Sequence, residues 1–153
     1  GKTRILARGL CPVHFVSHGL CAALEELIQY FEYIREVKFD IQVDDSIEFH
    51  DNTVATHLYY IAREAVNNAV KHSEADKINL FMQKENGSVH LCIQDNGKGM
   101  DTVMRTRGIG LQIMAYRAKI IDSRFAINTD KHGSSIDIYL VNPFTLAQGE
   151  SVI

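Results

Sequence analysis

The chain has 153 residues, of which 46% are hydrophobic, and a formal net charge of −3 at pH 7. This size and composition predict one domain with its own hydrophobic core, and they exclude a basic nucleic-acid-binding surface. No apolar run is long enough to span a membrane. The three cysteines (Cys11, Cys21 and Cys92) are odd in number and lack metal-ligand spacing, which predicts unpaired thiols in a reducing, cytoplasmic setting.

Helical and strand patterns alternate along the chain. The N-terminal stretch KTRILARGL is typical of the end of a helix and favours a fragment of a longer protein. Further helices are predicted over about 19–35, 51–72 and 109–121. Strands are predicted over about 37–43, 45–49, 77–84, 88–95, 124–128 and 134–140. Helices interleaved with antiparallel pairs predict an α+β sandwich, with a mixed, mostly antiparallel sheet covered on one face by about three helices.

The predicted helix that ends near His72 carries polar side chains where apolar ones could lie. At roughly 100° per residue, Glu64 and Asn68 form a stripe that borders the apolar arc, with Lys71 and His72 nearby. A solvated stripe, with Lys71 placed favourably at the helix end, is one interpretation. It explains two adjacent asparagines poorly, because Asn is a weak helix former. A ligand-facing stripe is the alternative.

The segment IQDNGKGM follows a predicted strand. Val89, Leu91 and Ile93 share one strand face, and by parity Asp95 points the same way, toward the core. A carboxylate in that position requires a hydrogen-bond donor. The glycines of DNGKGM allow the backbone to turn and to approach a ligand closely, although Asp-Asn-Gly is also ordinary turn chemistry.

The segment RGIGLQIM places Gly108 and Gly110 at the start of a predicted helix. Free backbone N–H groups and the positive end of the helix dipole can bind phosphate there. A single Gly-x-Gly before a helix is weak evidence. The specific signal is the order of three features: the acid-and-amide helix, the core-facing Asp95 and the glycine-rich helix start.

Together these motifs resemble the GHKL ATPase superfamily, and specifically the catalytic ATP-binding domain of bacterial sensor histidine kinases. EAVNNAVKH is similar to the N box, DNGKGM to the G1 box and RGIGLQIM to the G2 box. GLQIMAYRAKII and LARGLCPV…GLCAALEEL resemble the nitrate-sensor-like subfamily. The resemblance covers nearly the whole chain and implies a Bergerat-type sandwich. It also implies the end of a dimerisation helix and linker over 1–18, a catalytic domain over 19–145 and a tail over 146–153.

The resemblance also implies roles for individual residues. Glu64 positions or activates the attacking group, Asn68 coordinates Mg²⁺ and Lys71 contacts phosphate. Asp95 accepts from the adenine amino group, and Ser134, in phase with Ile136, lies near adenine. The residues expected around ATP are Asn68, Lys71, His72, Asp95, Gly97, Gly99, Met100, Arg107, Gly108, Ile109, Gly110, Leu111 and Ser134.

Two departures limit the resemblance. The lid segment DTVMRTR is short, and it leaves open which residue besides Lys71 contacts the γ-phosphate. Arg105 and Arg107 are candidates by their charge; the alternative is that both are solvated loop arginines. The acceptor histidine is expected on an upstream dimerisation helix, because neither His14 nor His18 has an adjacent acid.

The resemblance implies that ATP and Mg²⁺ are the cofactors. The expected partners are the dimerisation domain and a response regulator, in a homodimeric full-length protein; contact of this domain with nucleic acid or membrane is not expected. The alternatives are an anti-sigma-factor-type serine kinase of the same fold and a non-catalytic nucleotide-binding scaffold.

Overall fold

The computed structural model describes residues 19–49, 51–101 and 108–141. The helix end predicted over residues 3–9 and the tail predicted over 146–153 lie outside these ranges. The helices are α2 (Gly19–Ile34), α3 (Asn52–His72) and α5 (Ile109–Ile120). The strands are β1 (Lys38–Val43), β2 (Lys77–Glu85), β3 (Ser88–Asp95), β4 (Arg124–Asp130) and β5 (Gly133–Val141).

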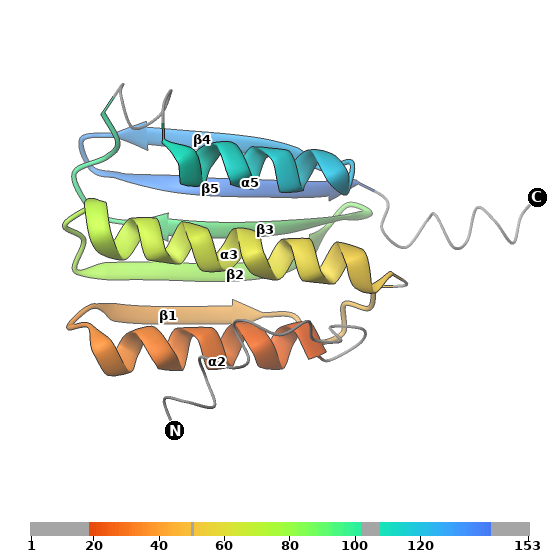
Figure 1. Ribbon diagram of the computed structural model, residues 1–153. Helices are drawn as coiled ribbons and strands as arrows, with labels where there is room; N and C mark the ends of the chain where they lie inside the picture. The colour runs from red at the N-terminus through yellow and green to blue at the C-terminus, as the bar shows by residue number, and fades with distance from the viewer. Residues whose placement is uncertain (1–18, 50, 102–107, 142–153) are drawn as a thin grey trace, which may run out of the picture.

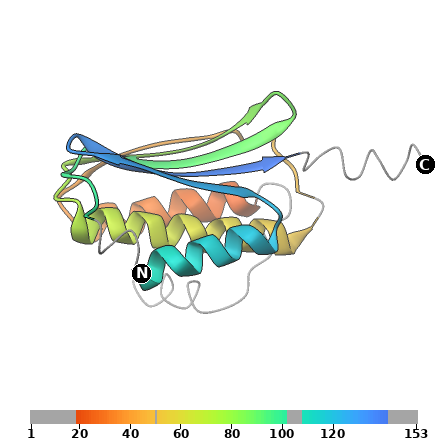
Figure 2. The same ribbon diagram turned by 90° about the horizontal axis from the view of Figure 1, so that it is seen from above.

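The described elements form two layers, a five-stranded sheet and three helices on one of its faces (Figures 1 and 2). The strand order is β1-β2-β3-β5-β4. Strand β1 runs parallel to β2, with α3 as the crossover between them, and the other neighbours are antiparallel. The predicted mixed, mostly antiparallel sandwich is therefore confirmed, and β3 and β5 lie side by side within it.

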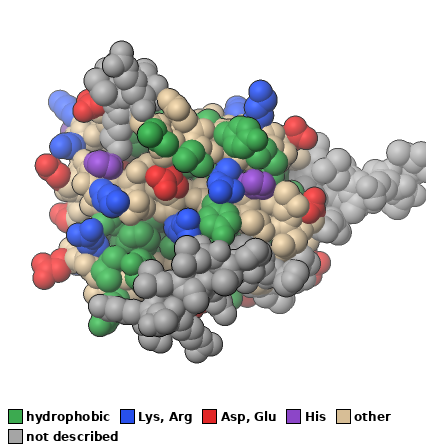
Figure 3. Space-filling view, in the orientation of Figure 1, with side chains coloured by type: hydrophobic (Ala, Val, Ile, Leu, Met, Phe, Trp, Pro, Cys, Tyr) green, Lys and Arg blue, Asp and Glu red, His purple; other side chains and the backbone are tan. Residues whose placement is uncertain are grey.

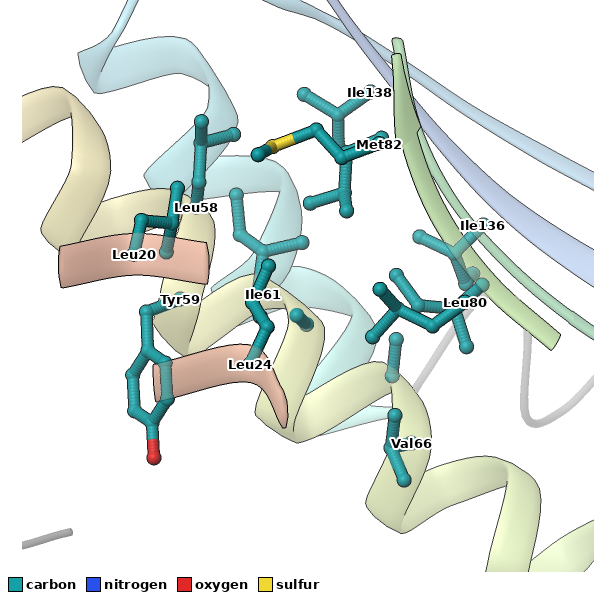
Figure 4. Packing of buried hydrophobic residues seen from close by; sticks show 14 of the residues in the cluster. Leu20, Leu24, Leu58, Tyr59, Ile61, Val66, Leu80, Met82, Ile136 and Ile138 are labelled. Carbon is teal, nitrogen blue, oxygen red and sulfur yellow. The ribbon is translucent and has the colours of Figure 1, made fainter. Parts of the chain in front are cut away.

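Helix α3 lies at the centre of the helical layer and contacts α2, α5 and β3. Its predicted apolar arc is buried: Ile61, Ala62 and Val66 are completely inaccessible to solvent. Figure 4 shows Ile61 and Val66 of α3 in the same buried cluster as the sheet residues Leu80 and Ile136. Each fully buried aliphatic side chain of this kind contributes about 1.5–3 kcal/mol. Every second side chain of the strands points toward the helices, and these side chains form the apolar sheet surface against which α3 packs.

Short-range signals determine where the elements begin and turn. The Asp51 side chain accepts a 2.8 Å hydrogen bond from the backbone N–H of Thr53, so Asp51, rather than Asn52, caps α3. Asn86 and Gly87 both have positive φ, at 49° and 82°, as a two-residue hairpin turn requires. The predicted hairpin between β2 and β3 is confirmed.

The short strand predicted over 45–49 was wrong. Its apolar alternation is real, because Ile47 and Phe49 are 2% and 3% exposed. The segment follows a turn in which Asp44 accepts hydrogen bonds from the backbone and side chain of Ser46. The two side chains reach the core from an irregular segment, which satisfies the hydrophobic pattern without a ladder of backbone hydrogen bonds.

The helical side of the molecule carries hydrophobic side chains among charged ones (Figure 3). On α5, Ile109 and Tyr116 are 72% and 66% exposed, whereas Leu111 and Met114 face the core. None of the helices among the described residues is both long and apolar enough to cross a membrane.

Candidate functional site

A cavity lies between the C-terminal half of α3 and the adjoining ends of β3 and β5. The empty space beside its lining residues, with the open solvent at its mouth included, is about 340 Å³. Its apolar wall consists of Ala65, Ala69, Ile93, Met100 and Ile136. Its polar lining consists of Asn68, His72, Ser73, Asp95 and Ser134, with Gly99 beside them. Ala65 and Ala69 of α3 have small side chains, and this leaves room between the helix and the sheet.

Asp95 is the last residue of β3 and is only 8% exposed. It lies in phase with Ile93, as strand parity predicted, and pairs across the ladder with Ser134. Its carboxylate accepts a 2.9 Å hydrogen bond from the backbone N–H of Gly97 and another from that of Ser134. Burial raises its pKa, and these two bonds offset only part of the effect. Because a carboxylate can accept about four hydrogen bonds, Asp95 can accept more than these two backbone groups supply.

The two glycines of DNGKGM are required by the protein backbone itself. A Cβ on Gly97 would collide with the carbonyl oxygen of Ser73 at the end of α3. Gly99 has a φ of +86°, and a Cβ there would collide with the carbonyl oxygen of Asp130. The sequence predicted that the backbone at these glycines comes close to a ligand. In the structure it comes close to the backbone of other segments of the chain, at Ser73 and Asp130. Of the two glycines, only Gly99 also lines the cavity.

Thr129 supports this wall and was missed by the sequence reasoning. Its Oγ1 lies 2.9 Å from Ser134 Oγ and accepts a 2.8 Å hydrogen bond from the backbone N–H of Met100. It thereby connects the segment after β3 to the β4–β5 hairpin. Thr129 and Ser134 are register partners on either side of the hairpin turn. The two residues directly flank the turn sequence DKHG. Pairing the residues across that turn would have identified Thr129 as the partner of Ser134 from the sequence.

The predicted polar stripe of α3 meets the first turn of α5. A Cβ on Gly110 would collide with Glu64 Oε1 and would lie 3.2 Å from Asn68 Nδ2. Glycine at this position therefore lets the helix start reach the acid and the amide directly. Gly108 is the N-cap of α5 and makes no side-chain capping bond. Glycine has no side chain that could cap the helix, so among residues 19–49, 51–101 and 108–141 nothing is shown to occupy the first-turn N–H groups of α5 as a cap. Free N–H groups at a helix start can bind phosphate.

The remaining predicted residues have different positions. Lys71 is exposed in the last turn of α3 and does not line the cavity, whereas His72 does. Ile109 is largely exposed, and Leu111, at 4% exposure, belongs to the core. Arg105 and Arg107 lie outside the described residues. The ligand roles of all these residues stay predictions.

Residues 53–144 match the family model described as histidine kinase-, DNA gyrase B-, and HSP90-like ATPase. The chain belongs to this family. The five-stranded sheet and helical layer agree with solved histidine kinases. A blue-light activated histidine kinase from Erythrobacter litoralis has a TM-score of 0.72 and 16% identity over 83% of this chain and 43% of that one. The catalytic domain of the histidine kinase ThkA has a TM-score of 0.64 and 16% identity over 80% of this chain and 93% of that one.

Three relatives by sequence are sensor kinases, as the resemblance predicted. The sensor histidine kinase LiaS of Bacillus subtilis is 32% identical over 90% of this chain and 38% of its own length. The sensor histidine kinase MctS of Rhizobium johnstonii is 30% identical over 88% and 30%, respectively. The nitrate/nitrite sensor protein NarX of Escherichia coli is 30% identical over 87% and 23%. The chain thus spans well under half the length of these relatives.

Proposed function

We propose that this chain is the ATP-binding catalytic domain of a sensor histidine kinase. It binds Mg-ATP and transfers the γ-phosphoryl group to a histidine of a dimerisation domain, which passes the group to a response regulator. The catalytic domain corresponds to residues 19–145. The full-length protein is a homodimer, and its catalytic domain transfers phosphate in the cytoplasm. The observation that carries the proposal is the carboxylate of Asp95. It is buried at the edge of a cavity and can accept more hydrogen bonds than its two backbone donors supply.

Adenine fits the chemistry of this cavity. Its exocyclic amino group donates to the ionised Asp95, and the hydroxyl of Ser134 lies across the ladder from that contact. Ile93 and Ile136, which are register partners, offer an apolar surface beside them. A few polar groups set in a mostly apolar wall are typical of sites that orient a planar ligand.

The residues where α3 meets α5 fit Mg²⁺ and a triphosphate. Mg²⁺ prefers oxygen ligands and keeps several waters, so the amide oxygen of Asn68 with phosphate oxygens is a sufficient donor set. When bound, Mg²⁺ neutralises charge on the phosphates. The first turn of α5, which begins at the N-cap Gly108, donates backbone N–H groups to the phosphates, and Gly110 admits them beside Glu64 and Asn68. Lys71, exposed on the last turn of α3, adds positive charge on the same side of the helix.

Glu64 is the group that acts on the acceptor. Its carboxylate oxygen lies at the start of α5, next to the position assigned to the phosphates. From there it can accept the N–H proton of the acceptor imidazole or orient that ring for attack. Transfer then depends on alignment and charge neutralisation more than on covalent participation of the protein.

Isothermal titration of the chain with ATP in the presence of Mg²⁺ tests the binding step. We expect saturable binding, and an absence of binding at millimolar nucleotide contradicts the proposal. Labelled ATP tests the transfer step. With a histidine-kinase dimerisation domain supplied, in cis or as a separate chain, we expect acid-labile label on that domain. Stoichiometric label on this chain alone, lost in a His18→Gln variant, would show that the acceptor was misassigned.

A further inference from the structure

The sheet face opposite the helices buries a cluster of polar side chains. His90, Cys92 and Asp137 are 8%, 4% and 5% exposed, although no described helix covers this face (Figure 2). One potential ligand atom from each residue lies within 4.8 Å of the others. The cluster is separate from the cavity. Successive side chains of β3 alternate between the two sheet faces, so His90 and Cys92 lie on the face opposite to that of Ile93 and Asp95, which line the cavity.

The strand register brings the three residues together. His90 and Cys92 are two apart in β3 and therefore share a face. Asp137 of β5 is the direct register partner of Cys92 and is diagonal to His90. Direct and diagonal cross-strand neighbours have Cβ atoms close enough for their side chains to meet. The three side chains therefore meet on one sheet face, over β3 and β5.

The imidazole of His90 is oriented from both sides. Its Nε2 lies 2.7 Å from Asp137 Oδ1, and its Nδ1 lies 3.2 Å from Glu85 Oε1. The ring stacks on Tyr139 at a centroid distance of 4.3 Å and meets Phe81 edge to face. A metal ion bound here would replace the proton shared by Nε2 and Asp137 Oδ1, while Nδ1 would keep its contact with Glu85. Glu85 would then be the outer carboxylate that metal-binding histidines typically have.

The carboxylate of Asp137 is held by one oxygen and presents the other. Its Oδ2 accepts hydrogen bonds of 2.7 Å from Ser135 Oγ and 3.0 Å from Asn128 Nδ2. Its Oδ1 faces His90. Ligating carboxylates are typically fixed by hydrogen bonds of this kind. The neighbouring thiol of Cys92 is buried beside this carboxylate and hydrogen-bonds to it. A divalent cation at this point would replace the thiol proton and compensate the charges of thiolate and carboxylate.

We propose that His90 Nε2, Cys92 Sγ and Asp137 Oδ1 bind a divalent transition-metal ion, with Zn²⁺ the best match. Nitrogen, sulfur and oxygen ligands together favour Zn²⁺ or Co²⁺ over Mg²⁺ and Ca²⁺, which prefer oxygen alone. Three protein ligands leave a fourth position for water or another donor. The ion connects β3 and β5, whose ends form the wall of the cavity on the opposite face. This inference does not rest on the proposed kinase activity.

Titration of the full chain with Co²⁺ tests the proposal, because a thiolate ligand produces a sulfur-to-cobalt charge-transfer band in the near ultraviolet. We expect saturation at one Co²⁺ per chain, loss of the band on addition of Zn²⁺, and loss of the band in Cys92→Ser. A matched control in which Cys11 and Cys21 are both replaced by serine should keep the band. An absence of the band in the unmodified chain, or its persistence in Cys92→Ser, overturns the proposal.

A second variant guards against misfolding of Cys92→Ser. The Glu85 side chain is 40% exposed, so Glu85→Gln should fold normally while it weakens the orientation of His90. We expect Co²⁺ affinity to fall about 10- to 100-fold, as is typical when an outer-shell partner is lost. Glu25→Gln, at the exposed carboxylate that contacts Cys21, should leave the affinity unchanged. If Glu85→Gln binds Co²⁺ like the unmodified chain, His90 is not a ligand and the cluster is only a hydrogen-bonded network.

Discussion

Two buried aspartates occupy opposite faces of the paired strands β3 and β5. Asp95, at the end of β3, faces the helices, and Asp137, within β5, faces away from them. Their exposures are close, at 8% and 5%. Their partners differ in kind. Asp95 accepts from two backbone N–H groups, whereas Asp137 accepts from the side chains of Ser135, Asn128 and Cys92 and contacts the imidazole of His90.

The two carboxyl groups therefore respond differently to similar burial. Burial raises the pKa of Asp95, and its backbone hydrogen bonds are too few to reverse the effect. Burial acts on Asp137 in the same direction, but side-chain hydrogen bonds outweigh it and lower the pKa. A buried carboxylate with few hydrogen-bond donors around it is suited to accept a hydrogen bond from a ligand. A carboxylate surrounded by donors is kept charged by the protein, and its removal should cost stability.

The largest expected effect is on stability. Asp137→Ala leaves the side chains of His90, Ser135 and Asn128 without their shared acceptor. We expect the free energy of unfolding in urea, with a chelator present, to fall by about 2–3 kcal/mol, as buried polar groups lose their partner. ATP affinity should be unchanged. An equal loss of ATP affinity would show that the two faces of the sheet are coupled.

Asp95→Asn should have the reverse profile. The substitution replaces an acceptor-only group with an amide that can present a donor to the adenine amino group. We expect ATP binding to weaken by about 1.5–3 kcal/mol, which is roughly 10- to 100-fold in the dissociation constant. Binding of inorganic triphosphate should not change, and thermal stability should not fall. Equal losses for ATP and GTP in calorimetry would contradict a role of Asp95 in reading the base.

Asn68→Ala extends the comparison to the other end of the ligand. Loss of the amide oxygen should weaken ATP about tenfold in the presence of Mg²⁺, as expected for a lost ligand contact of about 1.4 kcal/mol. The difference between titrations with and without Mg²⁺ should shrink accordingly. The adjacent Asn67→Ala is the matched control, because Asn67 does not line the cavity. Unfolding of Asn68→Ala would instead indicate a structural role.

The smallest expected effect is a dependence on pH. Because the folded pKa of Asp95 is raised, the folded protein takes up this proton more readily than the unfolded chain. The resulting stabilisation is present in acid and is lost as the pH rises through the folded pKa. ATP affinity changes in the opposite sense: it should begin to fall, on acidification, above the usual titration range of an aspartate. Calorimetry across that range should show a flat profile for Asp95→Asn.

Sequence patterns predicted the local features of this molecule well. Strand parity placed Asp95 on the core-facing side, and the motif before α5 placed Gly110 at a helix start that meets Glu64 and Asn68. Contacts between distant segments were not predictable in the same way. The collision partners of Gly97 and Gly99 belong to other elements, and the choice of glycine followed from them.

The cluster on the opposite face illustrates the same limit. His90 and Cys92 have no metal-ligand spacing that includes another cysteine or histidine nearby in sequence. Asp137 lies 47 residues from His90, and the two meet only because β5, rather than β4, pairs with β3. Strand order is a property of the whole sheet, since the chain passes from β3 through α5 and β4 before it reaches β5. No short segment encodes that order.

Strands β3 and β5 each contribute side chains to both faces, and this has a consequence for how the gene can change. Deletion or insertion of one residue within either strand would shift the register and exchange its two faces. Asp95 or Ser134 would then turn away from the cavity while Cys92 or Asp137 turned into the core. Point substitutions can alter one face alone, but a change of length alters both. Length variation among relatives of this chain should therefore be confined to the hairpin turns, near Asn86–Gly87 and Lys131–His132.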